Sequence, residues 1–231
     1  MAGRSVRFSK EWHVVKSVLF SRREPQIQNP KFLYPPVKPD PWHDCYARRA
    51  REEGYPARSV YKLEEIQKRF GVLKRGGRVL DLGCCPGSWL LFASRVVGDR
   101  GLVVGVDIIP LTLRLPSNVR FVQHDVLAWD EPFLDAIGTN FQTVLSDMAP
   151  STTESKFVDA QRSLQLSESA LAISARVLRP RGAFVCKIFH GSDFKGFSDR
   201  VRRYFGRVVH FKPKSSRKSS KEIYVVGLRR I

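Results

Sequence analysis

The chain has 231 residues, of which 42% are hydrophobic, which is enough for one substantial core. It carries 40 Lys and Arg against 22 Asp and Glu, a formal charge of +18, which indicates a polyanionic partner such as RNA, DNA or an acidic membrane rather than solubility alone. The longest apolar run, residues 101–111, is interrupted by Asp107 and is too short to cross a bilayer, and the first twenty residues lack the apolar core of a signal peptide.

The cysteines indicate a reducing compartment. They form no CxxC pair, and adjacent cysteines rarely bridge each other, so we expect free thiols and a cytoplasmic protein. The four are Cys45, Cys84, Cys85 and Cys186. A mitochondrial location stays open, because the first 16 residues contain four basic side chains and one acid, Glu11.

The N-terminal part of the chain predicts an extended arm followed by helices. Six prolines within residues 1–41 disfavour a helix, so we expect an arm there and one domain over residues 42–231. Residues 44–73 predict two helical pieces, split around Gly54 and Pro56. The second piece has an apolar face that should pack on a sheet. This face consists of Val60, Leu63, Ile66 and Phe70.

From Arg78 onward, short apolar runs alternate with amphipathic stretches. Strands are predicted at residues 79–83, 102–107, 119–125, 141–147, 182–189, 207–211 and 222–228, and helices at 88–97, 163–178 and 197–205. This alternation is typical of an α/β fold with a doubly wound, mostly parallel sheet. The last two strands are joined by a short loop, which permits an antiparallel hairpin at one edge.

Four aspartates lie at or near strand ends. Asp81 is within the first strand, Asp107 and Asp147 close the second and fourth, and Asp125 follows the third. Ligands of open α/β sheets bind beyond the carboxyl ends of the strands. Carboxylates gathered there would repel one another unless a ligand or backbone amides donate hydrogen bonds to them.

The stretch DLGCCPGSW, residues 81–89, predicts a strand that enters a glycine turn. Its Gly83 and Gly87 do not form a GxGxxG or GK[ST] motif, and no basic residue stands in the turn to meet a phosphate. A nucleoside without a phosphate chain therefore fits best. Asp107 is placed to accept from ribose hydroxyls and Asp125 from an adenine amino group, so S-adenosylmethionine fits better than NAD or ATP. The alternative is a plain turn that needs glycine at positive φ.

Cys84 and Cys85 stand in the same turn, and we interpret them as packing residues. A zinc site would need further Cys or His ligands at suitable spacing, which Cys45 and the histidines do not supply. No metal is therefore expected.

Five motifs in order along residues 57–227 resemble one family: ARSVYKLEEI, DLGCCPGSW, VLSDMAPSTTES, GAFVCKIFHG and KPKSSRKSSKEIYVVG. Together they are similar to the FtsJ (RrmJ-like) ribosomal RNA ribose 2′-O-methyltransferases. The resemblance implies a Rossmann-like sheet of seven strands with the last antiparallel, the class I methyltransferase fold. It also implies S-adenosylmethionine as methyl donor, with S-adenosylhomocysteine as product.

The resemblance also implies site residues. The family's catalytic tetrad matches Lys62, Asp147, Lys187 and Glu222. The predicted cofactor-binding residues are Gly83, Pro86, Gly87, Trp89, Asp107, Asp125 and Asp147. Small residues are common in the family where this chain has Cys84 and Cys85, and glycine is common where it has Ser88; these changes are small and should not block the cofactor.

The chemistry explains why two lysines and two acids would be needed. A ribose 2′-hydroxyl is a poor nucleophile, and the methyl group must be attacked in line from about 3 Å. A lysine could take the proton if burial or a neighbouring cation lowers its pKa from about 10.4, as Lys62 beside Lys187 would. Alternatively, Lys187 stays charged and stabilises the developing alkoxide. Without the resemblance, Lys187 could equally extend its ammonium to solvent from a strand end.

Basic segments abut the tetrad on both sides. One precedes Lys62 and contains Arg48, Arg49, Arg51 and Arg58, and the other precedes Glu222 and contains Lys212, Lys214, Arg217, Lys218 and Lys221. They could hold an RNA backbone around the catalytic pocket. DNA lacks the 2′-hydroxyl that such a site would methylate.

The sequence therefore predicts ribose 2′-O-methylation of RNA, with large-subunit ribosomal RNA in a ribosomal subunit as the expected partner. We expect a monomer without a membrane partner. Transfer RNA is an alternative substrate. A catalytically idle RNA-binding or ribosome-assembly factor is an alternative of another class, against which the intact tetrad argues.

Overall fold

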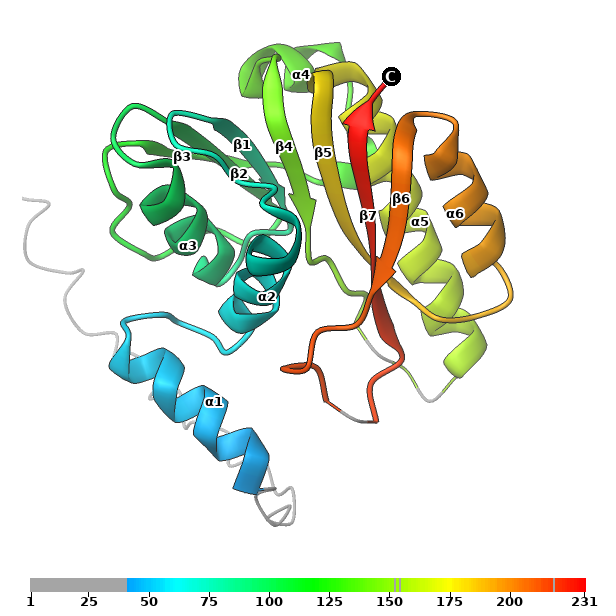
Figure 1. Ribbon diagram of the computed structural model, residues 1–231, viewed down its shortest axis with the longest axis horizontal. Helices are drawn as coiled ribbons and strands as arrows, with labels where there is room; N and C mark the ends of the chain where they lie inside the picture. Colours follow the sequence, from blue (N-terminus) through cyan, green and yellow to red (C-terminus); the bar gives the residue numbers. More distant parts are fainter. Residues whose placement is uncertain (1–40, 152, 154, 218) are drawn as a thin grey trace, which may run out of the picture. The chain divides into compact units, whose positions relative to one another are not determined.

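Seven strands form one mixed sheet in the order β3-β2-β1-β4-β5-β7-β6 (Figure 1). The structure, a computed structural model, describes residues 41–231 apart from residues 152, 154 and 218. The strands are β1 (Arg78–Leu82), β2 (Leu102–Asp107), β3 (Val119–Gln123), β4 (Phe141–Ser146), β5 (Leu178–Phe189), β6 (Phe205–Phe211) and β7 (Glu222–Arg230). The predicted arm over residues 1–41 lies outside the described residues except for Pro41.

The strand order of the sheet reverses between β1 and β4, because later strands are added on the β4 side. β1 pairs in parallel with β2 on one side and with β4 on the other, and β3 and β5 extend the two halves in parallel. Ligands of such sheets bind where the strand order reverses, outside the carboxyl ends of the strands. Asp81, Asp107 and Asp147 all lie at that edge, so the predicted doubly wound sheet brings the acids together.

The final hairpin places β7 inside the sheet. β7 is antiparallel to both of its neighbours, β5 and β6, so β6 becomes the edge strand. The predicted antiparallel last strand is confirmed. The register pairs Lys187 with Tyr224 and Phe189 with Glu222, so the two strands present their polar residues at the same end.

Helices cover both faces of the sheet. α2 (Val60–Phe70) and α3 (Ser88–Val97) pack on one face, and α4 (Glu131–Ile137), α5 (Lys156–Val177) and α6 (Phe194–Arg202) pack on the other (Figure 1). The predicted apolar face of α2 is confirmed at Leu63 and Ile66, which are fully buried against the sheet. None of the helices in the described part of the chain combines the length and apolar character needed to cross a membrane.

Alternation along the strands decides which face each functional side chain occupies. Val185 packs in the core beneath α2 and α3, whereas Cys186 and Ile188 pack in the core beneath α5. Because successive side chains of a strand point to opposite faces, Lys187 points to the α2 side. Tyr224 belongs to the same core as Val185, so the polar ends of β5 and β7 face α2.

Several element boundaries differ from the sequence prediction, and two elements were not predicted. α1 (Pro41–Glu52) begins at Pro41, which the sequence assigns to the arm, because proline is tolerated in the first turn of a helix, where its missing N–H has no intrahelical partner. Between β3 and β4 the chain also forms a short 3-10 helix, η1 (Val126–Ala128), and α4, neither of which was predicted. Both begin at an aspartate whose side chain accepts from a backbone N–H, Asp125 from Leu127 and Asp130 from Phe133.

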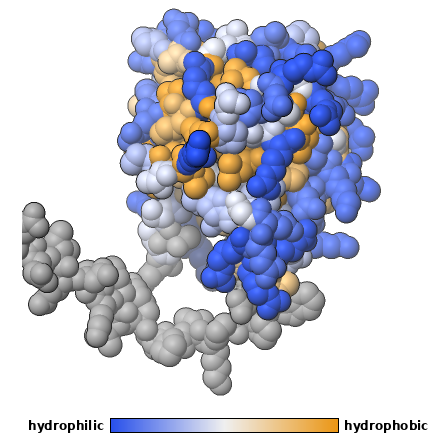
Figure 2. All heavy atoms as spheres, turned by 90° about the vertical axis from the view of Figure 1, so that its left-hand side faces the viewer, coloured by the Kyte–Doolittle hydropathy of each residue, from blue (hydrophilic) through white to orange (hydrophobic). Residues whose placement is uncertain are grey.

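The edge strand β3 is less covered than the centre of the sheet. Its residues are half-buried or exposed, and Val119 and Phe121 pack only partly against the core, as do Phe92 and Val96 of α3. Figure 2 views the molecule from the side on which β3 and α3 lie, and hydrophobic residues gather there within a hydrophilic border.

Candidate active site

The glycine turn joins β1 to α3 and needs both of its glycines. Gly83 and Gly87 have φ of 74° and 104°, a region that favours glycine. A Cβ at Gly83 would also lie 2.3 Å from Cγ of Met148, and one at Gly87 would lie 2.3 Å from Cδ1 of Leu113. The turn can therefore pack tightly against the segments that follow β2 and β4.

A pocket of about 410 Å³ opens at the carboxyl ends of β1, β2 and β4, and we call it the acidic pocket. Its lining includes Gly83, Cys85, Asp107, Asp125 and Asp147, together with the apolar Ile108, Ile109, Val126, Met148 and Leu166. It contains four of the predicted cofactor-binding residues. Among the residues that the structure describes, neither lysine nor arginine lines it.

Backbone amides fix the Asp107 carboxylate. Its Oδ2 accepts from the N–H of Cys85 at 2.8 Å and its Oδ1 from the N–H of Ile109 at 2.9 Å. The glycine turn and the loop after β2 are thus tied to the same side chain. One Asp125 oxygen accepts from the N–H of Leu127 at 2.9 Å. Each aspartate therefore has a fixed orientation before any ligand arrives.

Asp81 is the unusual acid of this edge. It is fully buried, and within the described part of the chain neither carboxyl oxygen has a hydrogen-bond partner. Burial raises the pKa of the Asp81 carboxyl well above its usual range, and the nearby charges of Asp147 and Asp107 raise it further. An unpartnered carboxyl group here can accept hydrogen bonds from a cationic ligand.

The remaining predicted cofactor residues do not line this pocket. They are Pro86, Gly87 and Trp89. Trp89 is 3% exposed, its Nε1 donates to the Ser59 carbonyl at 2.9 Å, and its ring stacks on Tyr224 at 6.0 Å. The indole therefore packs between α2 and β7 and does not line the acidic pocket, and its role in cofactor binding stays a prediction.

Cys84, Cys85 and Asp107 lie close enough for one metal ion, with ligand atoms within 4.8 Å of one another. Burial, followed by neighbouring acids, raises the pKa of both thiols, that of Cys85 to about 11. The thiolate is the metal-binding and nucleophilic form, so this environment disfavours metal binding and redox chemistry. Both Asp107 oxygens already accept backbone hydrogen bonds.

A second pocket of about 250 Å³, the lysine pocket, contains three of the four tetrad residues, Lys62, Lys187 and Glu222. Lys62 Nζ lies 2.8 Å from the Glu222 carboxylate, which joins α2 to the start of β7. Lys187 is 6% exposed, and its Nζ lies 2.9 Å from Asp147 Oδ1 and also donates to the Asp147 carbonyl. The tetrad residues, predicted from motifs far apart in the chain, therefore form two neighbouring ion pairs.

Asp147 connects the two pockets. It lines the acidic pocket and pairs with Lys187 of the lysine pocket, and Ala149 lines both. Burial alone would raise the pKa of the Asp147 carboxyl, but the charges of Lys187 and Lys62 and a 2.6 Å hydrogen bond from the Tyr224 hydroxyl outweigh it and lower that pKa. Asp147 is thus held as a carboxylate between the two cavities.

Sequence reasoning missed Tyr224 and Ser215, and it named Arg58 only within a basic segment, without its hydrogen-bond partner. Tyr224 was detectable, because it lies two residues after Glu222 on a strand and so shares its face. Arg58 donates to the Ser215 carbonyl at 2.7 Å, and both residues line the lysine pocket. No local pattern indicates that pair, because its members are 157 residues apart.

Only part of the predicted basic surface faces the tetrad. Arg58 and Arg217 line the lysine pocket. On α1, by contrast, Arg48 and Arg49 form ion pairs one turn apart with Glu52 and Glu53. The charge of that helix is therefore partly balanced by its own acids.

A family model described as FtsJ-like methyltransferase matches residues 55–230, which include both pockets. The chain belongs to this family of methyltransferases. Among its relatives, "Ribosomal RNA large subunit methyltransferase E" of Desulfatibacillum aliphaticivorans is 53% identical over 186 residues, 80% of this chain and 90% of that one. The protein of the same name from Desulforapulum autotrophicum is 49% identical and covers 83% of this chain and 94% of its own length.

The fold of this FtsJ-like methyltransferase is shared by solved structures. A ribosomal RNA methyltransferase from Plasmodium falciparum superposes with a TM-score of 0.68 at 26% identity, covering 76% of this chain and 98% of that one. The predicted class I methyltransferase fold is therefore confirmed, with its strand order 3-2-1-4-5-7-6.

Proposed function

We propose that this protein transfers a methyl group from S-adenosylmethionine to a ribose 2′-hydroxyl of large-subunit ribosomal RNA. Family membership and the names of its close relatives support the reaction class and the substrate. The single observation that carries the mechanism is Asp147, which belongs to the acidic pocket and is paired with Lys187 of the lysine pocket. Methyl donor and acceptor would meet across this residue.

The acidic pocket fits the proposed donor. S-adenosylmethionine supplies an electrophilic methyl on a cationic sulfonium and carries an ammonium group but no phosphate. Asp107, Asp125 and Asp147 line a pocket to which the described residues contribute no lysine or arginine. The unpartnered carboxyl of Asp81 is buried near Asp147 and Asp107. Ile108 and Ile109, both largely exposed, offer apolar surface to an adenine ring.

The lysine pocket would hold the acceptor ribose. Lys187 is positioned by Asp147, and Lys62 by Glu222, so both ammonium groups are fixed before substrate binds. A charged Lys187 stabilises the negative charge that develops on the 2′-oxygen while the hydroxyl proton passes to water. Alternatively, after losing its own proton, it accepts the hydroxyl proton as a general base. A pH profile of kcat separates the two, because only the second rises as a lysine deprotonates.

The test compares Lys187→Ala with wild type, using donor labelled in the methyl group and large ribosomal subunits that lack the modification. We expect kcat to fall by about 10²–10⁴-fold, the usual contribution of an acid–base group, while donor affinity is retained. Arg75→Ala is the matched control, because Arg75 is exposed and precedes β1 at the opposite end of the strands. Nuclease mapping then locates the methyl group on a ribose or a base.

Each outcome decides between named alternatives. Transfer by Lys187→Ala at the wild-type rate would mean that the tetrad mechanism is wrong. If wild type binds no methyl donor, the assembly-factor alternative is correct. Methylation of transfer RNA but not of ribosomal subunits would show that transfer RNA is the substrate.

A further inference from the structure

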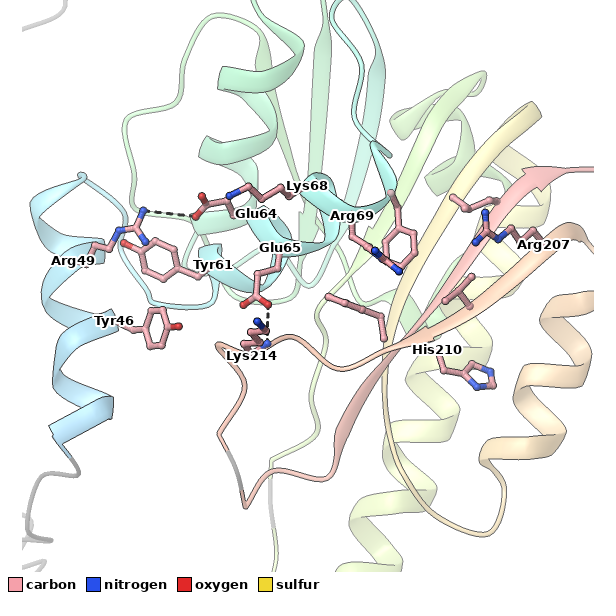
Figure 3. A pocket seen from close by; sticks show the side chains of 14 residues that line it. Tyr46, Arg49, Tyr61, Glu64, Glu65, Lys68, Arg69, Arg207, His210 and Lys214 are labelled. Carbon is pink, nitrogen blue, oxygen red and sulfur yellow. Dashed lines mark hydrogen bonds and ion pairs between the residues drawn. The ribbon is translucent and has the colours of Figure 1, made fainter.

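A groove of about 910 Å³ lies between α2 and the edge strand β6, outside the acidic and lysine pockets (Figure 3). Its walls come from three places: α2, the strands β6 and β7, and the loop that joins those strands. α1 closes one end with Tyr46 and Arg49. Grooves of this size are large enough to bind a ligand or a segment of a macromolecule.

The floor of the groove is apolar. Along β6, the groove is lined by Arg207, Val209 and Phe211. His210 lines it too, and its Nε2 lies 2.7 Å from Ser198 Oγ of α6. The Phe211 ring packs edge-on against Phe70 of α2 at 5.4 Å. The half-buried rings therefore leave apolar surface between two rows of charged side chains.

Most of the positive charge around this groove has no acidic partner. Lys68 and Arg69 on α2, Arg207 on β6 and Lys214 on the loop are exposed, and none forms an ion pair within the described residues. The two lining acids are already engaged. Glu65 accepts from the backbone N–H groups of Lys214 and Ser215, and Glu64 lies 3.9 Å from Arg49 (Figure 3).

The groove and the lysine pocket are lined by neighbouring residues on two segments of the chain. Lys214 lines the groove and Ser215, the next residue, lines the lysine pocket. On the facing helix, Tyr61 lines the groove and Lys62 the lysine pocket. Glu65 accepts hydrogen bonds from the N–H groups of both loop residues at 2.7 and 2.8 Å, so this part of the loop is anchored to α2.

We propose that this groove binds the RNA strand as it leaves the lysine pocket, with Lys68, Arg69, Arg207 and Lys214 against its phosphates. The proposal rests on the proposed function, because it takes RNA to be the substrate. Unpaired cations on both walls above an apolar, partly aromatic floor are the features that bind single-stranded nucleic acid. An acidic protein segment would use the same cations, and the test separates it from RNA.

The experiment reverses charge on both walls with the double variant Arg69→Glu/Arg207→Glu. The control, Arg75→Glu/Arg100→Glu, makes the same charge change at two exposed arginines that precede β1 and β2, at the other end of the strands. Affinity for purified large-subunit ribosomal RNA is measured by filter binding at several salt concentrations. Thermal unfolding checks that both variants fold.

We expect the groove variant to bind this RNA at least about tenfold more weakly than the control variant. Its plot of log affinity against log salt should be shallower by about 0.7 for each phosphate that the variant no longer neutralises. Its kcat at saturating RNA should stay near that of wild type, because neither arginine lines the lysine pocket. RNA should also protect Lys68 and Lys214 from chemical acetylation.

Equal weakening of RNA affinity in the two variants would overturn the proposal, because the effect would then be one of net charge. Wild-type affinity for naked RNA with weakened methylation of assembled subunits would assign the groove to a ribosomal protein instead. The filter-binding assay measures RNA affinity and does not depend on methyl transfer. If the wild-type protein binds RNA in the groove but methylates none, the proposed function is refuted, whereas the proposal that the groove binds RNA still stands.

Discussion

Asp81 places a carboxyl group inside the sheet, where water cannot stabilise its charge. An aspartate in an unfolded chain ionises near pH 4, whereas burial raises the pKa of Asp81 well above that value. Between those two pH values the unfolded chain releases a proton that the folded protein retains. The free energy of unfolding therefore falls as pH rises through this range.

Asp81→Asn should remove this pH-dependent destabilisation. We expect the variant to be more stable than wild type near about pH 8 and to show little advantage near about pH 3, where wild-type Asp81 is largely protonated in both states. A gain of about 1 kcal/mol would raise Tm by roughly 2–4 °C in a chain of this size. Thermal unfolding without methyl donor measures it, and an equal difference at both pH values would contradict the assignment.

At the scale of residues, the sequence predicted which side chains belong to the site better than it predicted what those side chains contact. Lys62 and Lys187 were predicted from motifs, and the structure pairs each with a predicted acid. The core position of Trp89 was not predicted, because a tryptophan near a glycine turn can either contact a ligand or fill a core. The partners of Asp147 could not be predicted in full, because Tyr224 reaches it from a strand 77 residues away.

At the scale of elements, the loop between β6 and β7 is fastened to α2 by one side chain. Glu65 accepts from two successive backbone N–H groups, and Arg58 adds a bond from the same region to the loop carbonyl of Ser215. Residues of this loop line both the groove and the lysine pocket. Its fixed position therefore matters to both surfaces.

Glu65→Ala should release the loop. Two backbone N–H groups lose their charged acceptor, which should lower the free energy of unfolding by about 1–3 kcal/mol. We expect faster tryptic cleavage within residues 212–221 and a lower kcat/KM for ribosomal RNA. Glu64→Ala is the matched control, because within the described part of the chain the only ion pair of Glu64 is a long one with Arg49. Equal cleavage of the two variants would show that Glu65 does not anchor the loop.

Element types were predicted well from the sequence, and boundaries less well. β2 and α3 match their predicted bounds because apolar periodicity starts and stops sharply there. β5 begins at Leu178, four residues before its predicted start, because Pro180 and Gly182 are typical of a loop. The pairing of β4 with β5 shifts register between Phe141 and Thr143, and Arg181 has a positive φ of 62°. Such an irregular strand start leaves no periodic signal.

At the scale of the whole molecule, a formal charge of +18 attracts any nucleic acid, whatever its sequence. Binding to RNA of unrelated sequence should therefore weaken steeply with salt, by about 10³–10⁵-fold between roughly 50 and 200 mM if six to ten phosphates are neutralised. Lys187→Ala should keep the same slope while it loses catalysis, because Lys187 is buried and paired with Asp147. Anisotropy titrations at several salt concentrations measure the slope for both proteins. An RNA affinity that does not change with salt would contradict binding driven by charge.

The position of β7 between β5 and β6 has a consequence for how the protein acquires activity. Glu222 meets Lys62 across 160 residues of sequence, and Tyr224 and Lys187 become neighbours only when β7 pairs with β5. Contacts between such distant segments carry a high entropic cost of loop closure and tend to form late in folding. Methyl transfer would therefore begin only when the sheet is complete, and a partly folded chain would hold RNA by charge without modifying it.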